Sequence, residues 1–169
     1  MNKNAKKYFI FRNQLTFFIY NSIILMLKYL CEDFYMQRKQ ARENAFMLIF
    51  ESICKKDETN EEIFDKAINV RELEYDDYVK NVFFGSSERI NEINEATEKH
   101  FKGWKSERIS PVSRAIIRLA AYEIMYMSDI PSRVSINEAI ELAKKFDDEK
   151  SYSFVNGVLN AVAVEFDRK

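Results

Sequence analysis

The sequence predicts an all-α fold, a compact bundle of about six to seven helices. Glycine and proline together contribute only five of 169 residues, too few for the many tight turns of a barrel or sandwich. Hydrophobic residues make up 47% of the chain, which excludes a disordered protein and supplies a core. Beyond residue 36, apolar side chains recur at the three- and four-residue spacing of amphipathic helices.

Two regions of different character divide the chain. Residues 1–35 carry five Lys/Arg and two Asp/Glu, a net +3, whereas residues 36–169 carry 21 and 25, a net −4. The uncharged stretch 13–27 is shorter than the roughly 20 apolar residues of a membrane-spanning helix, and no small-residue cleavage site follows it. Residue types favoured by AT-rich codons (Phe, Ile, Asn, Lys, Tyr) supply 21 of the first 35 residues. We interpret 1–35 as an extension outside the fold, translated from upstream of a natural start at Met36.

Two other interpretations of this N-terminal extension remain open. Residues 8–30 could form an amphipathic helix that touches a membrane, or the segment could be a signal or anchor. For 36–169 we expect a helical domain without a membrane segment, located in the cytoplasm.

The first part of this domain predicts three helical segments. Apolar spacing predicts a helix over 37–56, and a polar break then places Asn60 as the N-cap of a short helix over 61–69. A long helical segment over 75–101 follows, in which Gly85 and the two serines after it indicate a weak point or a close helix crossing.

The middle of the chain contains a turn and a well-marked helix start. Lys102 to Lys105 predict the turn, with Trp104 as a packing anchor. Ser110 and Pro111 supply an N-cap and a first helical residue. The next helix ends at Asp129-Ile130-Pro131, because proline disfavours helical geometry in the residue before it.

Two more helices complete the prediction. Ser135 and Glu138 have the spacing of a capping box that opens a helix running to Phe146. The last helix covers 151–166, where Gly157 suggests the close approach of a neighbouring helix. Five of its apolar side chains are expected to face inward: Phe154, Val155, Val158, Leu159 and Val162.

The chain lacks the residues that most catalytic and metal sites need. His100 is the single histidine, and Cys31 and Cys54 do not have the CxxC spacing of a metal or redox site. The three glycines are isolated, so no phosphate-binding glycine-rich loop can be formed. We therefore expect no catalytic residues, no metal and no cofactor.

The one concentrated basic feature opens the 37–56 helix. Arg38 and Arg42 are four residues apart and share a helical face, with Lys39 beside them. Cations at a helix N-terminus oppose the macrodipole, which suggests that they serve an external anion such as a phosphate. Single-stranded RNA fits this small basic footprint better than a duplex. The alternative is an ordinary solvated face.

Several segments, in order along 37–166, resemble the family of the bacterial transcription antitermination protein NusB. They are RKQARE (38–43), ISPVSRAIIRLAAYE (109–123), DIP (129–131), VSINEAIELAK (134–144) and FVNGVL (154–159). The resemblance implies an all-helical protein without catalytic activity. It also implies binding to the boxA element of ribosomal RNA leader transcripts, as a heterodimer with the ribosomal protein NusE, within RNA polymerase elongation complexes that hold other Nus factors.

The resemblance also assigns roles to individual residues. Phe50 falls where the family packs against NusE. The implied RNA-binding residues are Arg38, Lys39, Arg42, Asp129 and Arg133.

Departures from the family pattern leave alternatives open. Gln40 stands where a further arginine is common, and Tyr126 and Met127 supply no charge ahead of Asp129. The alternative function is a helical protein–protein interaction module that does not bind RNA. Self-association is also open, because some members of the family form homodimers.

Overall fold

The computed structural model describes residues 37–73, 75–101, 109–148 and 150–166. The chain divides into two compact units, Met1–Lys39 and Gln40–Lys169. The expectations for residues 1–35 and for the turn at 102–105, with Trp104, lie outside the described residues. Within the described ranges, no helix combines the length and the apolar character needed to cross a membrane.

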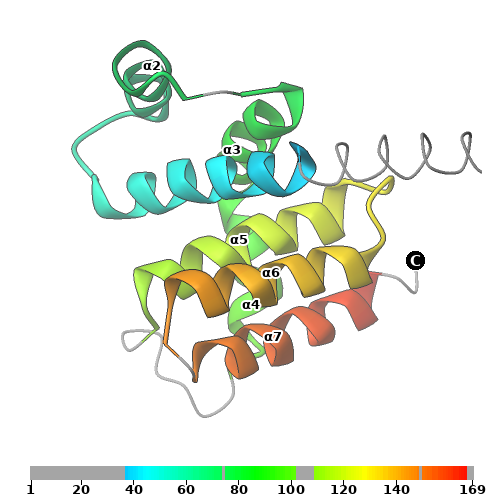
Figure 1. Cartoon of the computed structure of the whole chain (residues 1–169). Helices are drawn as coiled ribbons and strands as arrows, with labels where there is room; N and C mark the ends of the chain where they lie inside the picture. The colour runs from blue at the N-terminus through cyan, green and yellow to red at the C-terminus, as the bar shows by residue number, and fades with distance from the viewer. Residues whose placement is uncertain (1–36, 74, 102–108, 149, 167–169) are drawn as a thin grey trace, which may run out of the picture. The chain divides into compact units, whose positions relative to one another are not determined.

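All regular secondary structure in the described residues is helical, which confirms the predicted all-α class. Seven helices are described (Figure 1). They are the first helix over residues 37–54, α2 (Asn60–Arg71), α3 (Asp77–Glu88), α4 (Ile90–Glu98), α5 (Pro111–Tyr126), α6 (Ser132–Phe146) and α7 (Ser151–Phe166).

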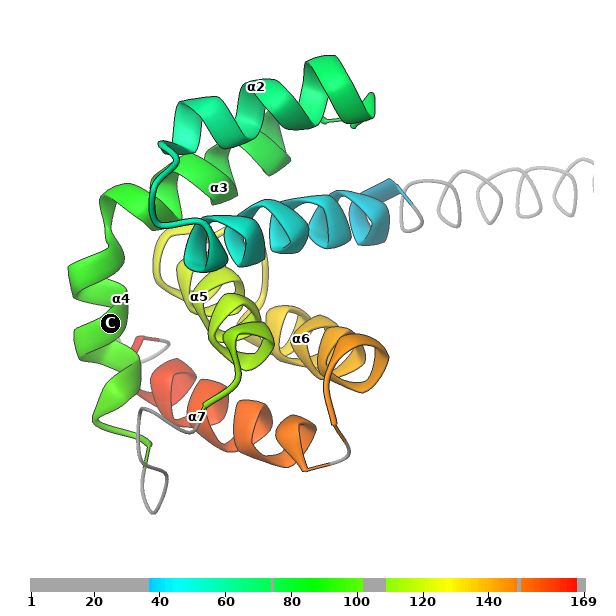
Figure 2. The same ribbon diagram turned by 90° about the vertical axis from the view of Figure 1, so that its left-hand side faces the viewer.

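The helices of the Gln40–Lys169 unit are arranged in two groups. Helices α5, α6 and α7 pack against one another, and α4 runs along one side in contact with α5 and α7 (Figure 2). Residues 40–54 lie with α2 and α3 on the other side of α5 (Figures 1 and 2). One apolar core joins the two groups, and α5 contributes three alanines to it that let neighbouring helices approach closely.

Helix α5 begins where the sequence predicts. The Ser113 backbone N–H donates to Ser110 Oγ at 2.9 Å, and Pro111 occupies the first helical position. Helix α7 also has its predicted bounds, and all five of its predicted inward-facing side chains are buried. These helices carry their start signals and apolar faces locally, so short-range rules suffice to predict them.

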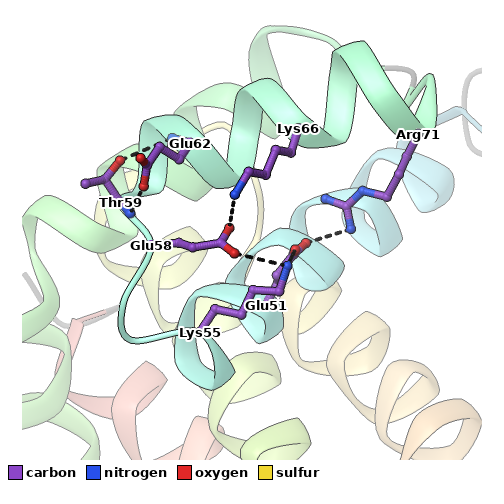
Figure 3. A network of polar contacts seen from close by, with 7 residues as sticks. All are labelled: Glu51, Lys55, Glu58, Thr59, Glu62, Lys66 and Arg71. Atoms are coloured by element: carbon purple, nitrogen blue, oxygen red, sulfur yellow. Dashed lines mark hydrogen bonds and ion pairs between the residues drawn. The ribbon is translucent and has the colours of Figure 1, made fainter.

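Several helix boundaries differ from the prediction. The N-cap of α2 is Thr59 rather than Asn60, because Thr59 Oγ1 accepts from the Glu62 N–H and Glu62 Oε2 accepts from the Thr59 N–H (Figure 3). The long 75–101 segment breaks at Arg89, between α3 and α4, rather than at Gly85.

The predicted capping box at Ser135 is wrong. Helix α6 starts three residues earlier because the Pro131 carbonyl already accepts from the N–H groups of Val134 and Ser135, at 2.8 and 3.3 Å. Ser135 therefore lies inside the helix and is only 1% exposed. Glu138, the other half of the predicted box, is buried in the same way.

The two glycines behave differently. Gly85 confirms a close helix crossing, because the Tyr122 hydroxyl of α5 occupies the space that a side chain at this position would need. Gly157 contradicts its prediction, since it is exposed and nothing lies near the position of a Cβ atom. The Asn160 side-chain amide instead donates to the Asn156 carbonyl along the same helix, at 2.8 Å.

Candidate functional site

Arg38 and Lys39 lie at the beginning of the described part of the first helix, residues 37–54, and both are partly exposed. They belong to the first of the two compact units. Partly exposed cations of this kind can contact an anionic ligand.

Arg42 is placed quite differently, in the interior of the second unit, where it is 3% exposed. Its Nε donates to Glu123 Oε1 of α5 at 2.9 Å. The Tyr78 hydroxyl of α3 donates to the same oxygen at 2.6 Å, and Arg42 Nη1 lies 3.8 Å from Glu138 Oε2 of α6. The guanidinium is also 5.9 Å from the centre of the Tyr78 ring. We call these four residues the Arg42 cluster.

The Arg42 cluster places the Arg42 side chain in the core rather than on the exposed face that its spacing from Arg38 predicts. Burial, the largest single effect, would lower the pKa of the Arg42 guanidinium, but Glu123, Tyr78 and Glu138 together outweigh it and raise the pKa above its usual range. Arg42 is therefore charged and already paired. To reach a phosphate it would have to leave Glu123 unpaired in the core, which costs several kcal/mol. The i, i+4 spacing from Arg38 does not bring the two arginines to a common exposed surface.

Asp129 and Arg133 lie at the connection between α5 and α6, and both side chains are exposed. A turn shapes the connection, in which the Ile130 N–H donates to the Met127 carbonyl at 2.9 Å. Arg133 occupies the first turn of α6. The predicted positions at this loop are thus accessible to a ligand.

Phe50 is half-buried, and its ring centre is 6.2 Å from that of Phe46 in the core. Next to it, Glu51 accepts from Lys55 Nζ at 2.7 Å and pairs with Arg71 Nη1 of α2 at 2.7 Å (Figure 3). These contacts tie α2 to the end of the 37–54 helix. The exposed part of the Phe50 ring is therefore presented on a braced surface.

Three residues of this unit were not singled out from the sequence. Glu123 and Tyr78 complete the Arg42 cluster, and Arg118 is a half-buried arginine of α5. A signal for Glu123 was available, because it is an acid within the apolar face of a strongly predicted helix. No such signal marks Tyr78 or Arg118, since aromatic residues and arginines are common on half-buried faces.

The part of the chain that the structure describes contains no group of three or more His, Cys, Asp or Glu side chains able to hold a metal ion. Cys54 is exposed and not in a disulfide. Described polar groups form hydrogen-bonded anchors between helices, and cations are exposed or partly exposed on the 37–54 helix and in the first turn of α6. Fold and site together define the class: an all-helical binding protein with exposed positive charge on these two helices.

Comparison with known proteins identifies the family. The profile of the NusB family matches residues 39–164. The transcription antitermination protein NusB of Listeria monocytogenes serotype 4b (strain CLIP80459) is 42% identical over 131 residues, which cover 77% of this chain and 98% of the relative. This chain therefore belongs to the NusB family.

Solved structures agree with this assignment. NusB of T. maritima superposes with a TM-score of 0.67 at 34% identity, covering 76% of this chain and 91% of that one. A chain from a complex of the antitermination factors NusB and NusE with double-stranded RNA superposes with a TM-score of 0.67 at 28% identity, covering 76% and 97%.

Proposed function

We propose that this chain is a transcription antitermination protein that binds boxA-type RNA of ribosomal RNA leader transcripts together with the ribosomal protein NusE. The observation that carries the proposal is the 42% identity to an antitermination NusB over 98% of that relative's length. The likeness to a chain from a NusB–NusE–RNA complex supports RNA and NusE as the partners.

Arg38, Lys39 and Arg133 are the residues we assign to RNA phosphates, with Asp129 as an acceptor for base or ribose donors. All four are at least partly exposed. Arg42 has a positioning role, because it ties the start of the bundle to α5 and α6 rather than facing outward.

Phe50 contributes an aromatic contact to NusE, because its partly exposed ring sits on the braced end of the 37–54 helix. In this role the protein is a binding factor rather than an enzyme. It acts in the cytoplasm, where it joins RNA polymerase elongation complexes that hold other Nus factors.

Fluorescence anisotropy with labelled RNA tests the proposal. The RNAs are a single-stranded boxA sequence, a scrambled sequence of equal composition and a boxA duplex, each titrated with and without NusE. We expect single-stranded boxA to bind most tightly, and only when NusE is present. Equal weak binding to boxA and scrambled RNA in the presence of NusE would contradict the sequence-specific proposal.

Alanine variants locate the RNA surface. Replacing Arg38 and Lys39 together, or Arg133 alone, should weaken binding and lower the salt dependence by about one unit of slope for each phosphate that is no longer bound. Lys144→Ala is the matched control, because Lys144 is an exposed cation paired with Glu141 at 2.7 Å. Loss of RNA affinity in Arg42→Ala, with unchanged melting, would return Arg42 to the RNA surface.

A protein–protein interaction module without RNA binding is the second candidate. The burial of Arg42 favours it, because one of the three cations at the helix start is unavailable to RNA. Retained NusE binding without RNA crosslinking in cells would support this candidate against the first.

We also propose that 36–169 is the functional domain and that 1–35 lies outside its fold. The family match over residues 39–164 supports this boundary. Mass spectrometry of the native protein tests it, because peptides from residues 8–28 should be missing if translation starts at Met36.

A further inference from the structure

A cavity of about 520 Å³ lies between the end of the 37–54 helix, α4 and α5. Its described lining residues include the cations Lys56, Arg114 and Arg118 and one acid, Glu98. The cavity therefore carries an excess of positive charge on a domain that is acidic as a whole.

Arg118 is the distinctive group of this cavity. Its Nε donates to the Ser86 carbonyl at 3.3 Å and its Nη2 donates to Ser87 Oγ at 2.6 Å. Both acceptors are neutral, and no carboxylate among the described residues forms an ion pair with Arg118. Burial lowers the pKa of the guanidinium to about 10, so the group stays charged at neutral pH while partly withdrawn from water. A half-buried charge of this kind is stabilised by a ligand of opposite sign.

Two adjacent lysines beside the cavity differ in whether an acidic side chain pairs with them. Lys55 pairs with Glu51 at 2.7 Å and lies 3.6 Å from Glu58 (Figure 3). Lys56, the next residue, lines the cavity, and in the described part of the chain it forms no ion pair. Glu51 and Glu58 thus neutralise Lys55, which faces α2, whereas the positive charge of Lys56 at the cavity is not neutralised by an ion pair in the described residues.

The walls of the cavity indicate the kind of ligand. Ile53, Ile93, Ile117 and Phe101 supply an apolar surface next to the cations. The space is much larger than a bare anion needs and is in the range of small-molecule and side-chain pockets. An anionic group joined to an apolar body fits both features.

The position of the cavity favours protein over RNA. Ile53 follows Phe50 by three residues, so the cavity adjoins the surface that we assign to NusE. Along the helix, Ile53 lies about 16 Å from Arg42, at eleven residues of 1.5 Å each. The RNA contacts that we assign in the same unit, Asp129 and Arg133, lie on the α5–α6 connection.

We call this cavity the Arg118 pocket. We propose that the Arg118 pocket binds an acidic side chain of NusE that lies beside an apolar residue. The carboxylate meets Arg118 and Lys56, and the apolar neighbour contacts the isoleucine wall. This inference rests on the proposed function only in that NusE is the partner.

Isothermal titration calorimetry of the full chain with NusE tests the pocket. Arg118→Gln should weaken NusE binding by about 10- to 100-fold, because it removes the half-buried one of the two cations that meet the partner's carboxylate. Arg118→Lys should recover part of this loss, since it restores the charge without the guanidinium geometry. Each Asp and Glu of NusE is then changed to its amide, and one of these changes should be non-additive with Arg118→Gln.

Lys56→Gln keeps the test decisive if Arg118→Gln does not fold. Lys56 is exposed, so its replacement leaves folding unchanged while weakening NusE binding severalfold, more at low salt than at high salt. Lys80→Gln, an exposed lysine of α3, is the matched control and should bind as wild type.

Three outcomes would overturn the inference. Wild-type affinity in both Arg118→Gln and Lys56→Gln removes the pocket from the NusE interface. Loss of RNA binding in these variants, with NusE binding unchanged, would assign the pocket to RNA. Absence of NusE binding by the wild-type chain would refute the proposed partner itself, and with it the occupant of the pocket.

Discussion

Arg42 and Arg118 are both withdrawn from solvent, and both contact residues of α3, but their partners differ. Arg42 faces Glu123 and Glu138, with the Tyr78 hydroxyl on the shared oxygen. Arg118 has only a backbone carbonyl and a serine hydroxyl. A paired guanidinium is a structural anchor, whereas one with neutral partners beside a cavity can accept a ligand. The charge of an arginine thus says less about its role than the carboxylates around it.

The largest expected effect comes from unpairing Arg42. Glu123→Gln keeps the shape of the side chain but removes the charge that Arg42 needs in the core. We expect the free energy of unfolding to fall by about 3 kcal/mol, measured by urea denaturation. Glu141→Gln, which breaks the exposed pair with Lys144, should cost at most about 0.5 kcal/mol. Similar losses in the two variants would mean that the buried cluster is no stronger an anchor than a surface pair.

The next effect comes from the crossing that aligns α3 with both arginines. Gly85→Ala places a methyl group against the Tyr122 hydroxyl, so the free energy of unfolding should fall by about 1–3 kcal/mol. Adding Tyr122→Phe removes the overlapping oxygen and should restore part of the loss. Gly157→Ala is the matched control and should stabilise by about 0.5–1 kcal/mol, because the site is open and helical. Thermal melting of the three variants checks these signs, and equal effects at the two glycines would contradict the close crossing.

A third change would make Arg118 resemble Arg42. Ser87→Asp places a carboxylate on the position that already accepts from Arg118 Nη2 at 2.6 Å. An internal countercharge should lower NusE affinity about tenfold, measured by calorimetry, because the partner's carboxylate loses its site. Ser87→Asn is the neutral control and should bind nearly as wild type. Unchanged affinity in Ser87→Asp would separate Arg118 from the interface.

The smallest effect concerns the start of α5, where a third polar anchor resembles the Arg42 cluster. Asp147 Oδ2 accepts from the hydroxyls of Ser110 and Ser113, each at 2.6 Å. Burial alone would raise the pKa of Asp147, but these hydrogen bonds outweigh it and hold the pKa below its ordinary value of 3.8. Because the folded pKa is the lower one, Asp147 contributes stability above pH 3.8 and loses it as the pH falls through the folded value.

Asp147→Asn should therefore be less stable than wild type at pH 7, and the difference should narrow below about pH 4. Urea midpoints of both proteins from pH 7 to pH 3 measure this. A difference that does not change with pH would show that the Asp147 charge contributes nothing to the anchor.

Sequence rules predicted the parts of the fold that depend on near neighbours. Ser110 and Pro111 start α5 because a side-chain cap and a fixed proline φ act within one turn. The inward face of α7 follows from helical periodicity in the same way. The prediction at Ser135 failed because the Pro131 carbonyl offered an earlier start and the core took up the Ser135 side chain. The spacing alone could not show whether α6 would start after Pro131 or after Ser135, because packing of the Ser135 side chain decided between them.

In the candidate site, too, some positions depend on near neighbours in sequence and others on distant ones. The exposed positions of Asp129 and Arg133 follow from a proline-terminated helix and need no distant contact. Arg42 could not be separated from Arg38 by spacing, because its partners stand 81 and 96 positions further along the chain.

The sequence by itself determined the helical class, the family resemblance and most helix limits, because composition, periodicity and caps act over a few residues. Only the tertiary structure decided which basic side chains remain available to a ligand. Folding brings Glu123 and Glu138 to Arg42 and none of the described carboxylates into an ion pair with Arg118. The role of a buried charge depends on groups that are distant in sequence and adjacent only in space.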